Sequence, residues 1–221
     1  VWLALLSGRP PWIAISLALS FGSYALVRKL AHGVGAVAGL TVETALLTPL
    51  REGGESMLAL DVTDPSATSG YHGPYPRLMW EFINSKLGQT WSKPIFTRLK
   101  LRAGLGVGDR CGLNNGDRDC VEEWVAIFGA GYYPQGDPNL STYTNDPNSG
   151  SYTTKGRGVF IVRVKDGSIL GQLAQDPHSA TYSKMRYAIP AEPAVLDLNF
   201  DGFADVVYIG DLGGQLWKWD L

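Results

Sequence analysis

Oxygen-bearing side chains recur at alternate positions in one short stretch near the end of the chain, Asp197-Leu-Asn-Phe-Asp-Gly-Phe-Ala-Asp. They occupy loop positions 1, 3, 5 and 9, and position 6 is a glycine, which tolerates a sharp turn. Calcium takes roughly six to eight oxygen ligands from carboxylates, amides and backbone carbonyls. The stretch therefore predicts a Ca²⁺ site built from Asp197, Asn199, Asp201, the backbone carbonyl of Phe203, and Asp205.

The second half of this stretch departs from the helix-loop-helix calcium motif. Position 12 is Tyr208 instead of glutamate, and the flanking sequences are typical of strands. Asp205 is therefore expected to supply the last anionic ligand. Three carboxylates within nine residues repel one another unless a cation neutralises them, and no Lys or Arg lies in the stretch. An empty polar turn is the alternative, and Mg²⁺ is disfavoured because it prefers water and phosphate ligands.

An internal repeat of short strands surrounds the acidic stretch. Residues 56–131 and 158–210 share the same order of four expected strands, and a third copy begins at Gln215. The strands are expected at 57–63, 78–82, 93–99 and 124–131 in the first copy, and at 159–164, 168–173, 192–198 and 205–213 in the second. Four short strands in each recurring unit are typical of propeller blades.

The predicted fold class follows from this repeat. It is all-β, a partial β-propeller of two to three blades of antiparallel strands over residues 51–221, preceded by an apolar helical N-terminus of two segments. One blade cannot bury both of its faces, so each blade needs neighbours. Because propellers use roughly four to eight blades, the propeller is expected to be incomplete in this chain. An unrelated antiparallel sandwich is the alternative.

Residues 1–50 are a sequence of a different kind. Two apolar stretches, 12–27 and 33–50, flank Arg28 and Lys29, and Glu43 is the one charge in the second stretch. Each stretch is slightly shorter than the roughly 20 residues that span a bilayer, which a tilted helix accommodates. A transmembrane hairpin is one interpretation of these stretches and a fusion artefact is the other, while a signal peptide fits less well because there are two apolar segments. As an anchor, the hairpin would place Arg28 and Lys29 in the cytoplasm and the remaining chain outside.

Composition narrows the possible functions. The formal net charge of −2 gives no reason to expect a nucleic-acid partner. The sequence contains no nucleophile elbow, phosphate loop or metal-hydrolase motif, so it is not expected to be an enzyme. The two cysteines, Cys111 and Cys120, lie in a polar loop at a spacing that fits a disulfide in an oxidising compartment, or free thiols in the cytosol.

Several segments in order along residues 51–221 resemble the PilY/PilC family of type IV pilus assembly and adhesin proteins. They are Gly53-Gly-Glu-Ser-Met-Leu-Ala-Leu-Asp-Val-Thr-Asp-Pro, Trp80-Glu-Phe, Leu87-Gly-Gln-Thr-Trp-Ser-Lys-Pro, Ile127-Phe-Gly-Ala-Gly-Tyr, and Val195-Leu-Asp-Leu-Asn-Phe-Asp-Gly-Phe-Ala-Asp-Val-Val-Tyr-Ile-Gly-Asp-Leu-Gly-Gly-Gln-Leu-Trp-Lys-Trp-Asp-Leu. The resemblance implies a modified β-propeller whose calcium loop maps onto Asp197, Asn199, Asp201, Phe203 and Asp205.

The same resemblance implies a function. Calcium in this loop is expected to regulate pilus extension and retraction, and through them twitching motility and surface attachment. The implied partners are pilins and other type IV pilus components, with a host or abiotic surface as the adhesion target. The implied location is the periplasm, the outer membrane or the cell surface, in association with pili. The resemblance does not extend to the N-terminal region of the family, so it implies no adhesive role of that region.

Residues 1–50 resemble a different family. Ser7-Gly-Arg-Pro-Pro-Trp-Ile-Ala, Ser20-Phe-Gly, Arg28-Lys29 and Gly39-Leu-Thr-Val-Glu-Thr are similar to a stretch of the RarD-like branch of EamA transporters. Two helices do not make a transporter, and the match ends abruptly near Leu50. The join is interpreted as an artefact of gene assembly, with a natural fusion that anchors the chain in the inner membrane as the alternative.

Two other functions are weighed against the pilus interpretation. Quinoprotein dehydrogenases are also propellers with related blade sequences, and they bind pyrroloquinoline quinone in the centre of a complete ring. The sequence shows no such cofactor site. A transporter fragment is the second alternative, and it rests on residues 1–50 alone.

Overall fold

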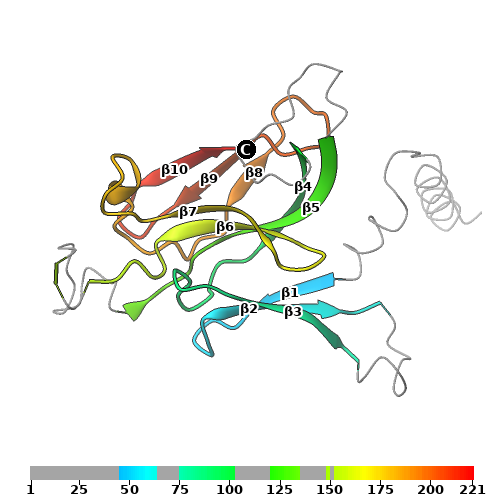
Figure 1. The fold of residues 1–221 in the computed structure, drawn as a ribbon, viewed down its shortest axis with the longest axis horizontal. Helices are drawn as coiled ribbons and strands as arrows, with labels where there is room; N and C mark the ends of the chain where they lie inside the picture. Colours follow the sequence, from blue (N-terminus) through cyan, green and yellow to red (C-terminus); the bar gives the residue numbers. More distant parts are fainter. Residues whose placement is uncertain (1–44, 64–74, 103–119, 135–147, 150–151) are drawn as a thin grey trace, which may run out of the picture. The chain divides into compact units, whose positions relative to one another are not determined.

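The computed structural model describes residues 45–63, 75–102, 120–134, 148–149 and 152–221, all of which belong to one compact unit, Thr41–Leu221. These residues form three antiparallel sheets (Figure 1). The N-terminal sheet has the order β1 (Ala45–Pro49), β2 (Ser56–Asp61), β3 (Arg77–Ile83). The central sheet has the order β4 (Ile95–Arg102), β5 (Cys120–Gly129), β6 (Gly158–Arg163), β7 (Ile169–Ala174). The C-terminal sheet has the order β10 (Leu216–Asp220), β9 (Val206–Gly210), β8 (Ala194–Leu196), and a 3-10 helix, η2 (Tyr182–Lys184), precedes β8.

The all-β prediction is confirmed for the described residues, and every strand expected in 51–221 has a counterpart there. The grouping of strands into sheets differs from the expectation. The two strand pairs of one repeat do not share a sheet, because β3 does not pair with β4 and β7 does not pair with β8. Instead, the central sheet joins the last two strands of the first repeat to the first two of the second. The four-strand repeat in the sequence is therefore offset by two strands from the four-stranded central sheet. The propeller assignment stays a prediction.

The offset has a physical cause in the burial of the strands. Every residue from Val125 to Gly129 in β5 and from Gly158 to Val162 in β6 is buried, so both strands need cover on both faces. Such strands are stable in the middle of a sheet that lies between two others. The outer strand β4 carries Arg98, Lys100 and Arg102 at alternate positions, which suits a sheet edge. The order of strands along the sequence does not reveal which neighbours share hydrogen bonds.

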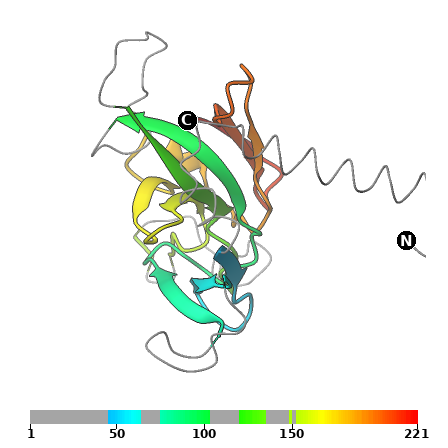
Figure 2. The ribbon, with the colours of Figure 1, turned by 90° about the vertical axis from the view of Figure 1, so that its right-hand side faces the viewer.

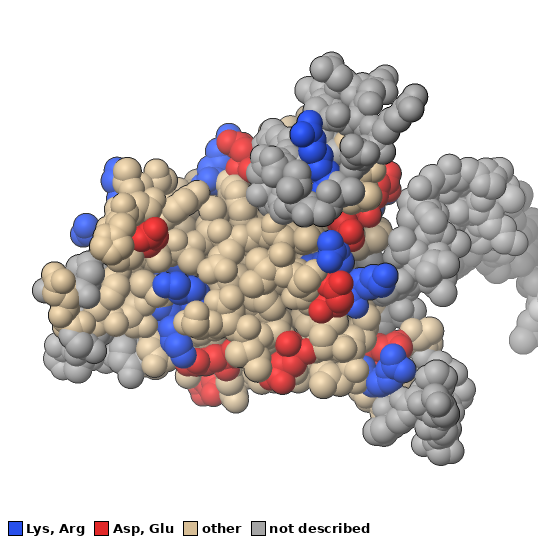
Figure 3. Space-filling model, in the orientation of Figure 1, with Lys and Arg blue, Asp and Glu red and all other residues tan. Residues whose placement is uncertain are grey.

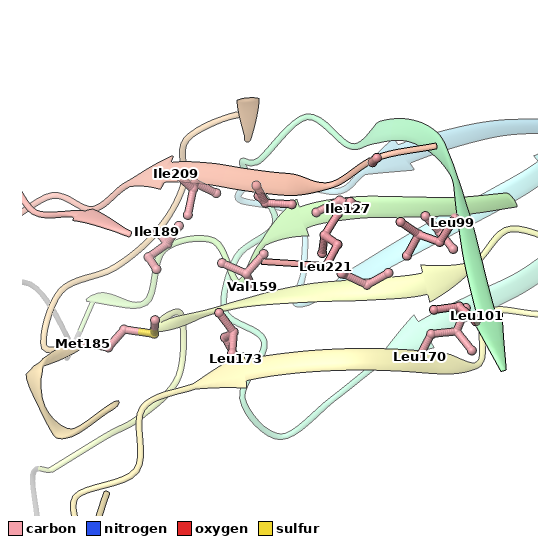
Figure 4. Packing of buried hydrophobic residues seen from close by; sticks show 14 residues of the cluster. Leu99, Leu101, Ile127, Val159, Leu170, Leu173, Met185, Ile189, Ile209 and Leu221 are labelled. Carbon is pink, nitrogen blue, oxygen red and sulfur yellow. The ribbon is translucent and has the colours of Figure 1, made fainter. Parts of the chain in front are cut away.

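The central sheet is covered on both faces, and both views of the ribbon show it between the other two sheets (Figures 1 and 2). One apolar cluster fills the space toward the C-terminal sheet (Figure 4) and is made by Leu99, Leu101, Val125, Ile127, Val159, Ile161, Leu170, Leu173, Met185, Ile189, Ala204, Val207, Ile209 and Leu221. The other fills the space toward the N-terminal sheet and is made by Leu47, Met57, Ala59, Phe82, Leu87, Ala126, Phe128, Ala130, Phe160, Val162 and Val164. The alternation of side chains along β5 and β6 supplies both clusters.

Residues Ala45–Pro49 correct the expected extent of the N-terminal helical segment. They were expected to lie in an apolar helix that ends at residue 50, but they form β1 and pair with β2 from Ala45↔Asp61 to Pro49↔Met57. The edge of β2 offers unpaired backbone groups, and β1 satisfies them while it buries Leu47 in the core. The remaining part of the predicted hairpin, residues 1–44, lies outside the described residues. Where the chain is described, it contains no helix with the length and apolar character needed to cross a membrane.

The turn between β6 and β7 provides a test of stability against pH. Burial raises the pKa of Asp166, but hydrogen bonds from Ser168 and the charge of Arg163 outweigh it and lower this pKa below its ordinary value of 3.8. Ser168 N donates to Asp166 Oδ1 over 2.9 Å. Folding therefore favours the ionised carboxyl. The stabilisation by ionised Asp166 is complete above the pKa that this carboxyl has in the unfolded chain. It is lost as the pH falls through the lower pKa of the folded state.

We expect the free energy of unfolding of the parent protein to fall more steeply below about pH 4 than that of Asp166→Asn. The asparagine keeps an oxygen that accepts the hydrogen bond from Ser168 N, but it does not titrate. Urea unfolding at a series of pH values from neutral to acidic measures both slopes. Equal slopes for the two proteins would contradict the assignment of this acid sensitivity to Asp166.

Candidate metal centre

The predicted metal-binding loop, residues 197–205, connects β8 to β9. The two strands pair up to the loop itself, since Leu196 lies opposite Val206. Asp205 N donates to Leu196 O over 2.9 Å, so the first and last predicted ligands, Asp197 and Asp205, are held at the two ends of a closed hairpin. The hairpin also receives the end of the chain, because Leu221 N donates to Asp205 O over 2.8 Å. The sheet therefore fixes the separation of the ends of the loop.

The side chains with oxygen atoms turn toward the backbone of their own loop. Asp197 Oδ2 accepts from Gly202 N over 2.8 Å, and Asp201 Oδ1 accepts from Phe203 N over 2.9 Å. Asn199 Oδ1 accepts from Asp201 N over 2.9 Å. These bonds wind the loop around its own acidic side chains.

Asp205 closes this network from the far end of the loop. Its Oδ2 accepts from Leu198 N over 2.7 Å and from Asn199 N over 3.3 Å. One carboxylate oxygen thus joins position 9 of the loop to positions 2 and 3. All five predicted ligand residues lie in this one loop, and Asn199 and Asp201 are exposed to solvent.

Backbone conformation explains the glycine at position 6. Gly202 has a φ of 89°, which side chains rarely adopt, as the sequence predicted from the need for a sharp turn. A Cβ at this position would also lie 2.6 Å from Arg98 Nη2. Phe200 also has a positive φ, of 60°, and this residue is 90% exposed. Two left-handed residues within three positions thus reverse the chain sharply.

Two cations beside the loop were not found from the sequence. Arg98 and Lys100 lie on β4 of the central sheet, and both face the ring of Phe203, with Arg98 Cζ 4.9 Å and Lys100 Nζ 6.0 Å from its centroid. Arg98 O accepts a hydrogen bond from Ala204 N over 2.9 Å. The sequence shows no Lys or Arg within the loop, and β4 is about a hundred residues away from it in sequence. The alternation of cations along β4 is the one local signal, and it does not indicate the contact.

The residues present suit Ca²⁺ in their chemistry and only partly in their arrangement. Carboxylates, an amide oxygen and a backbone carbonyl are the hard donors that Ca²⁺ prefers. Within the described ranges, however, no three His, Cys, Asp or Glu side chains come close enough together to form a metal site. The carboxylates instead accept hydrogen bonds from the loop backbone. The donor set therefore fits the ion, and binding of Ca²⁺ would require the three carboxylates to move closer together.

Cys120 lies at the start of β5 and is disulfide-bonded. The only other cysteine in the sequence, Cys111, lies outside the described residues. Of the two states that the sequence left open, the structure thus has the oxidised one. This state is typical of proteins in oxidising compartments.

These features define an all-β protein of three antiparallel sheets, with an oxygen-rich loop between two strands of its last sheet. Over 178 residues the chain is 33% identical to the type IV pilus biogenesis factor PilY1 homolog of Xylella fastidiosa. This alignment covers 76% of this chain and 9% of that protein. The chain is 27% identical over 181 residues to the type IV pilus biogenesis factor PilY1 of Pseudomonas aeruginosa. That alignment covers 80% of this chain and 11% of the Pseudomonas protein. The chain is therefore homologous to PilY1 pilus biogenesis factors, and it spans about a tenth of their length.

Two further comparisons complete this result. The crystal structure of the Pseudomonas aeruginosa PilY1 C-terminal domain aligns with a TM-score of 0.49 and 26% sequence identity, covering 80% of this chain and 26% of that one. No protein-family model matches the chain.

A separate, shorter similarity involves a membrane protein. Over 43 residues, 20% of this chain, the sequence is 56% identical to an uncharacterized transporter of Pseudomonas aeruginosa, and the match covers 14% of that protein. The assignment of residues 1–50 to an EamA-like segment stays a prediction, as does the interpretation of the join near Leu50.

Proposed function

We propose that this chain is a calcium-binding β-propeller segment of a type IV pilus biogenesis protein, and that calcium in its 197–205 loop regulates pilus extension and retraction. The single observation that carries the pilus assignment is the homology to PilY1 factors over three quarters of the chain. The calcium assignment is supported by the oxygen-only donor set at the closed end of the β8–β9 hairpin. Twitching motility and surface attachment are the outputs that this regulation would control.

The residues that would hold the cation are Asp197, Asn199, Asp201, Asp205 and the carbonyl of Phe203. A bound Ca²⁺ supplies positive charge, which offsets the mutual repulsion of three carboxylates in one loop. The loop residues bind and orient, and the hairpin keeps their ends together. No proton or electron transfer is needed, which agrees with relatives that are named as biogenesis factors and not as enzymes.

The location and partners follow from the same homology. We infer an association with type IV pili, with pilins and other pilus components as partners, in the periplasm, at the outer membrane or on the cell surface. The disulfide at Cys120 fits such an oxidising location. Basic and acidic side chains are interspersed over the face drawn in Figure 3, where no basic stripe of the kind that binds nucleic acid is seen among the described residues.

Calcium titration of the full 221-residue chain tests this proposal. We expect millimolar calcium to raise the melting temperature, because a ligand that binds only the folded state stabilises it by about 2.7 kcal/mol at a hundred times its Kd. For a domain of this size the rise is roughly 5–10 °C. Asp201→Ala should abolish the rise, because it removes a ligand from the middle of the loop.

Asp176→Ala is the matched control, since Asp176 is an exposed aspartate outside the loop that accepts a hydrogen bond from His178 N. It should keep the full calcium-induced rise. An unchanged melting curve of the parent protein in calcium would refute the metal site and leave the pilus homology intact. The pilus part is tested separately by deleting the gene in its own bacterium, where normal twitching and pilus number would refute it.

A further inference from the structure

We propose that Arg98 is a positioning residue of the calcium loop, and that through Arg98 the loop and the central sheet influence each other. This inference rests on the proposed calcium site. The relevant juxtaposition is that Arg98 of β4 contacts both the ring of Trp124, its cross-strand neighbour on β5, and the ring of Phe203 in the loop. These contacts connect a strand of one sheet to the proposed metal-binding loop of the next.

The contacts of Arg98 with the loop are close and of several kinds. Its Cζ lies 4.9 Å from the centroid of the Phe203 ring and 5.8 Å from that of Trp124, both within the range of cation–π attraction. Its backbone oxygen accepts from Ala204 N over 2.9 Å, and Ala204 is buried. Its Nη2 occupies the space beside Gly202 where a side chain would otherwise lie. Arg98 therefore contacts three consecutive residues of the loop, 202–204.

These contacts concern a residue whose backbone would bind the ion. The ligand atom of Phe203 is its carbonyl oxygen, so the position of this ligand depends on the backbone and not on the side-chain chemistry. By contacting the ring of Phe203, Arg98 restricts the position of the Phe203 backbone. A cation–π contact is typically worth a factor of about 2 to 30 in an equilibrium, and a loop that is already held loses less entropy when it binds an ion.

The charge of Arg98 acts in the opposite direction. A guanidinium beside the loop repels a divalent cation, so on charge alone its removal would strengthen calcium binding. Within the described ranges, Arg98 forms its ion pair with Glu122, at 3.9 Å, and not with a loop aspartate. Its side chain is 24% exposed, and solvent and Glu122 both weaken this repulsion. We therefore expect the positioning effect to exceed the repulsion.

Coupling of this kind is reciprocal. If packing of β4 against the loop raises calcium affinity, calcium must strengthen that packing by the same factor. The bound loop would then hold the C-terminal sheet more firmly on the central sheet. This gives the proposed regulation a structural output: a firmer junction between two sheets when the loop is loaded.

A double-mutant cycle on the full chain separates positioning from charge. Calcium affinity is measured by titration calorimetry for the parent, Arg98→Met, Phe203→Leu and the double variant. We expect Arg98→Met to weaken calcium binding about 2- to 30-fold when Phe203 is present, and not to weaken it when residue 203 is leucine. In the leucine background the ring is gone, so the cation–π contact is lost while the repulsive charge of Arg98 remains. An equal factor in both backgrounds, or no loss in the parent background, would overturn the inference.

Two more variants test whether the effect is specific to Arg98 and to its planar guanidinium group. Lys100→Met removes one positive charge from the same strand, next to the same ring, and should weaken calcium binding less than Arg98→Met, because at 6.0 Å Lys100 lies at the outer limit of cation–π attraction. A loss as large as that of Arg98→Met would deny Arg98 a specific role. Arg98→Lys keeps the charge without the planar group that stacks, and it should lose affinity even if Arg98→Met proves unstable.

The cycle also distinguishes failure of this inference from failure of the proposed site. If the parent protein binds no calcium, the proposed function fails, and with it the role of Arg98 in binding. If the parent binds calcium and the cycle shows no coupling, only the inference fails. Melting temperatures of the same four proteins in chelator measure the Arg98–Phe203 contact without metal. There, non-additive losses for Arg98→Met and Phe203→Leu are expected, and strictly additive losses would contradict the contact itself.

Discussion

Phe128→Ala is expected to lower the free energy of unfolding by about 3–5 kcal/mol, the usual cost of truncating a buried phenylalanine. Phe128 is fully buried in β5 and packs edge-on against Phe82 of the N-terminal sheet at 5.6 Å between ring centroids. Phe160 completes the group, at 5.2 Å from Phe82. The truncation leaves a cavity between two sheets that neither sheet can fill. Thermal unfolding should show a decrease of roughly 6–20 °C in melting temperature.

Phe200→Ala is the matched control for this prediction. It is the same substitution, but Phe200 is 90% exposed in the loop between β8 and β9. We expect its effect on stability in chelator to stay within about 0.5 kcal/mol. Comparable losses for the two variants would contradict the assignment of Phe128 to the core between the sheets.

Asp205→Ala is expected to remove the calcium response and also to destabilise the calcium-free protein. As a ligand, its carboxylate should contribute more than about 100-fold to calcium affinity, because even residues that only support ligands contribute 10- to 100-fold. In addition, Asp205 Oδ2 accepts from two solvent-exposed backbone amides of the loop, so its loss should cost roughly 0.5–1.5 kcal/mol without calcium. Calorimetric titration and melting curves in chelator measure the two effects separately.

Asp205→Asn separates the two roles of this residue. Asparagine keeps an oxygen that can accept from Leu198 N, so much of the calcium-free stability should return. The negative charge is still missing, so calcium affinity should remain at least about tenfold below that of the parent. If Asp205→Asn binds calcium as tightly as the parent, Asp205 is a structural acceptor and the ion has other ligands.

The sequence predicted the strands well because their signals are local. Alternation in 57–63, an opening proline in 93–99 and the apolar run in 124–131 each indicate a strand without reference to the rest of the chain. The acidic loop was equally accessible, since its oxygen side chains and Gly202 lie within nine residues. The left-handed conformation of Gly202 agrees with this part of the interpretation.

The features that the sequence did not predict depend on contacts between distant residues. Pairing of β5 with β6 spans a long connection, and only burial on both faces of each strand explains it. Strand β1 was hidden in an apolar stretch, because Leu47 has the same appearance in a membrane helix and in a buried strand. Arg98 reaches the loop from another sheet, and no spacing rule connects the two.

The offset between sequence repeats and sheets determines where this protein can be divided. A fragment cut between the repeats, within residues 132–157, would separate β5 from β6 and leave two bare strand edges that invite pairing with other chains. Cuts in the connections from β3 to β4 or from β7 to β8 would leave each sheet whole. Exchange of parts between relatives, in the laboratory or in evolution, should therefore preserve solubility when the joints fall in those two connections, even though they interrupt a repeat.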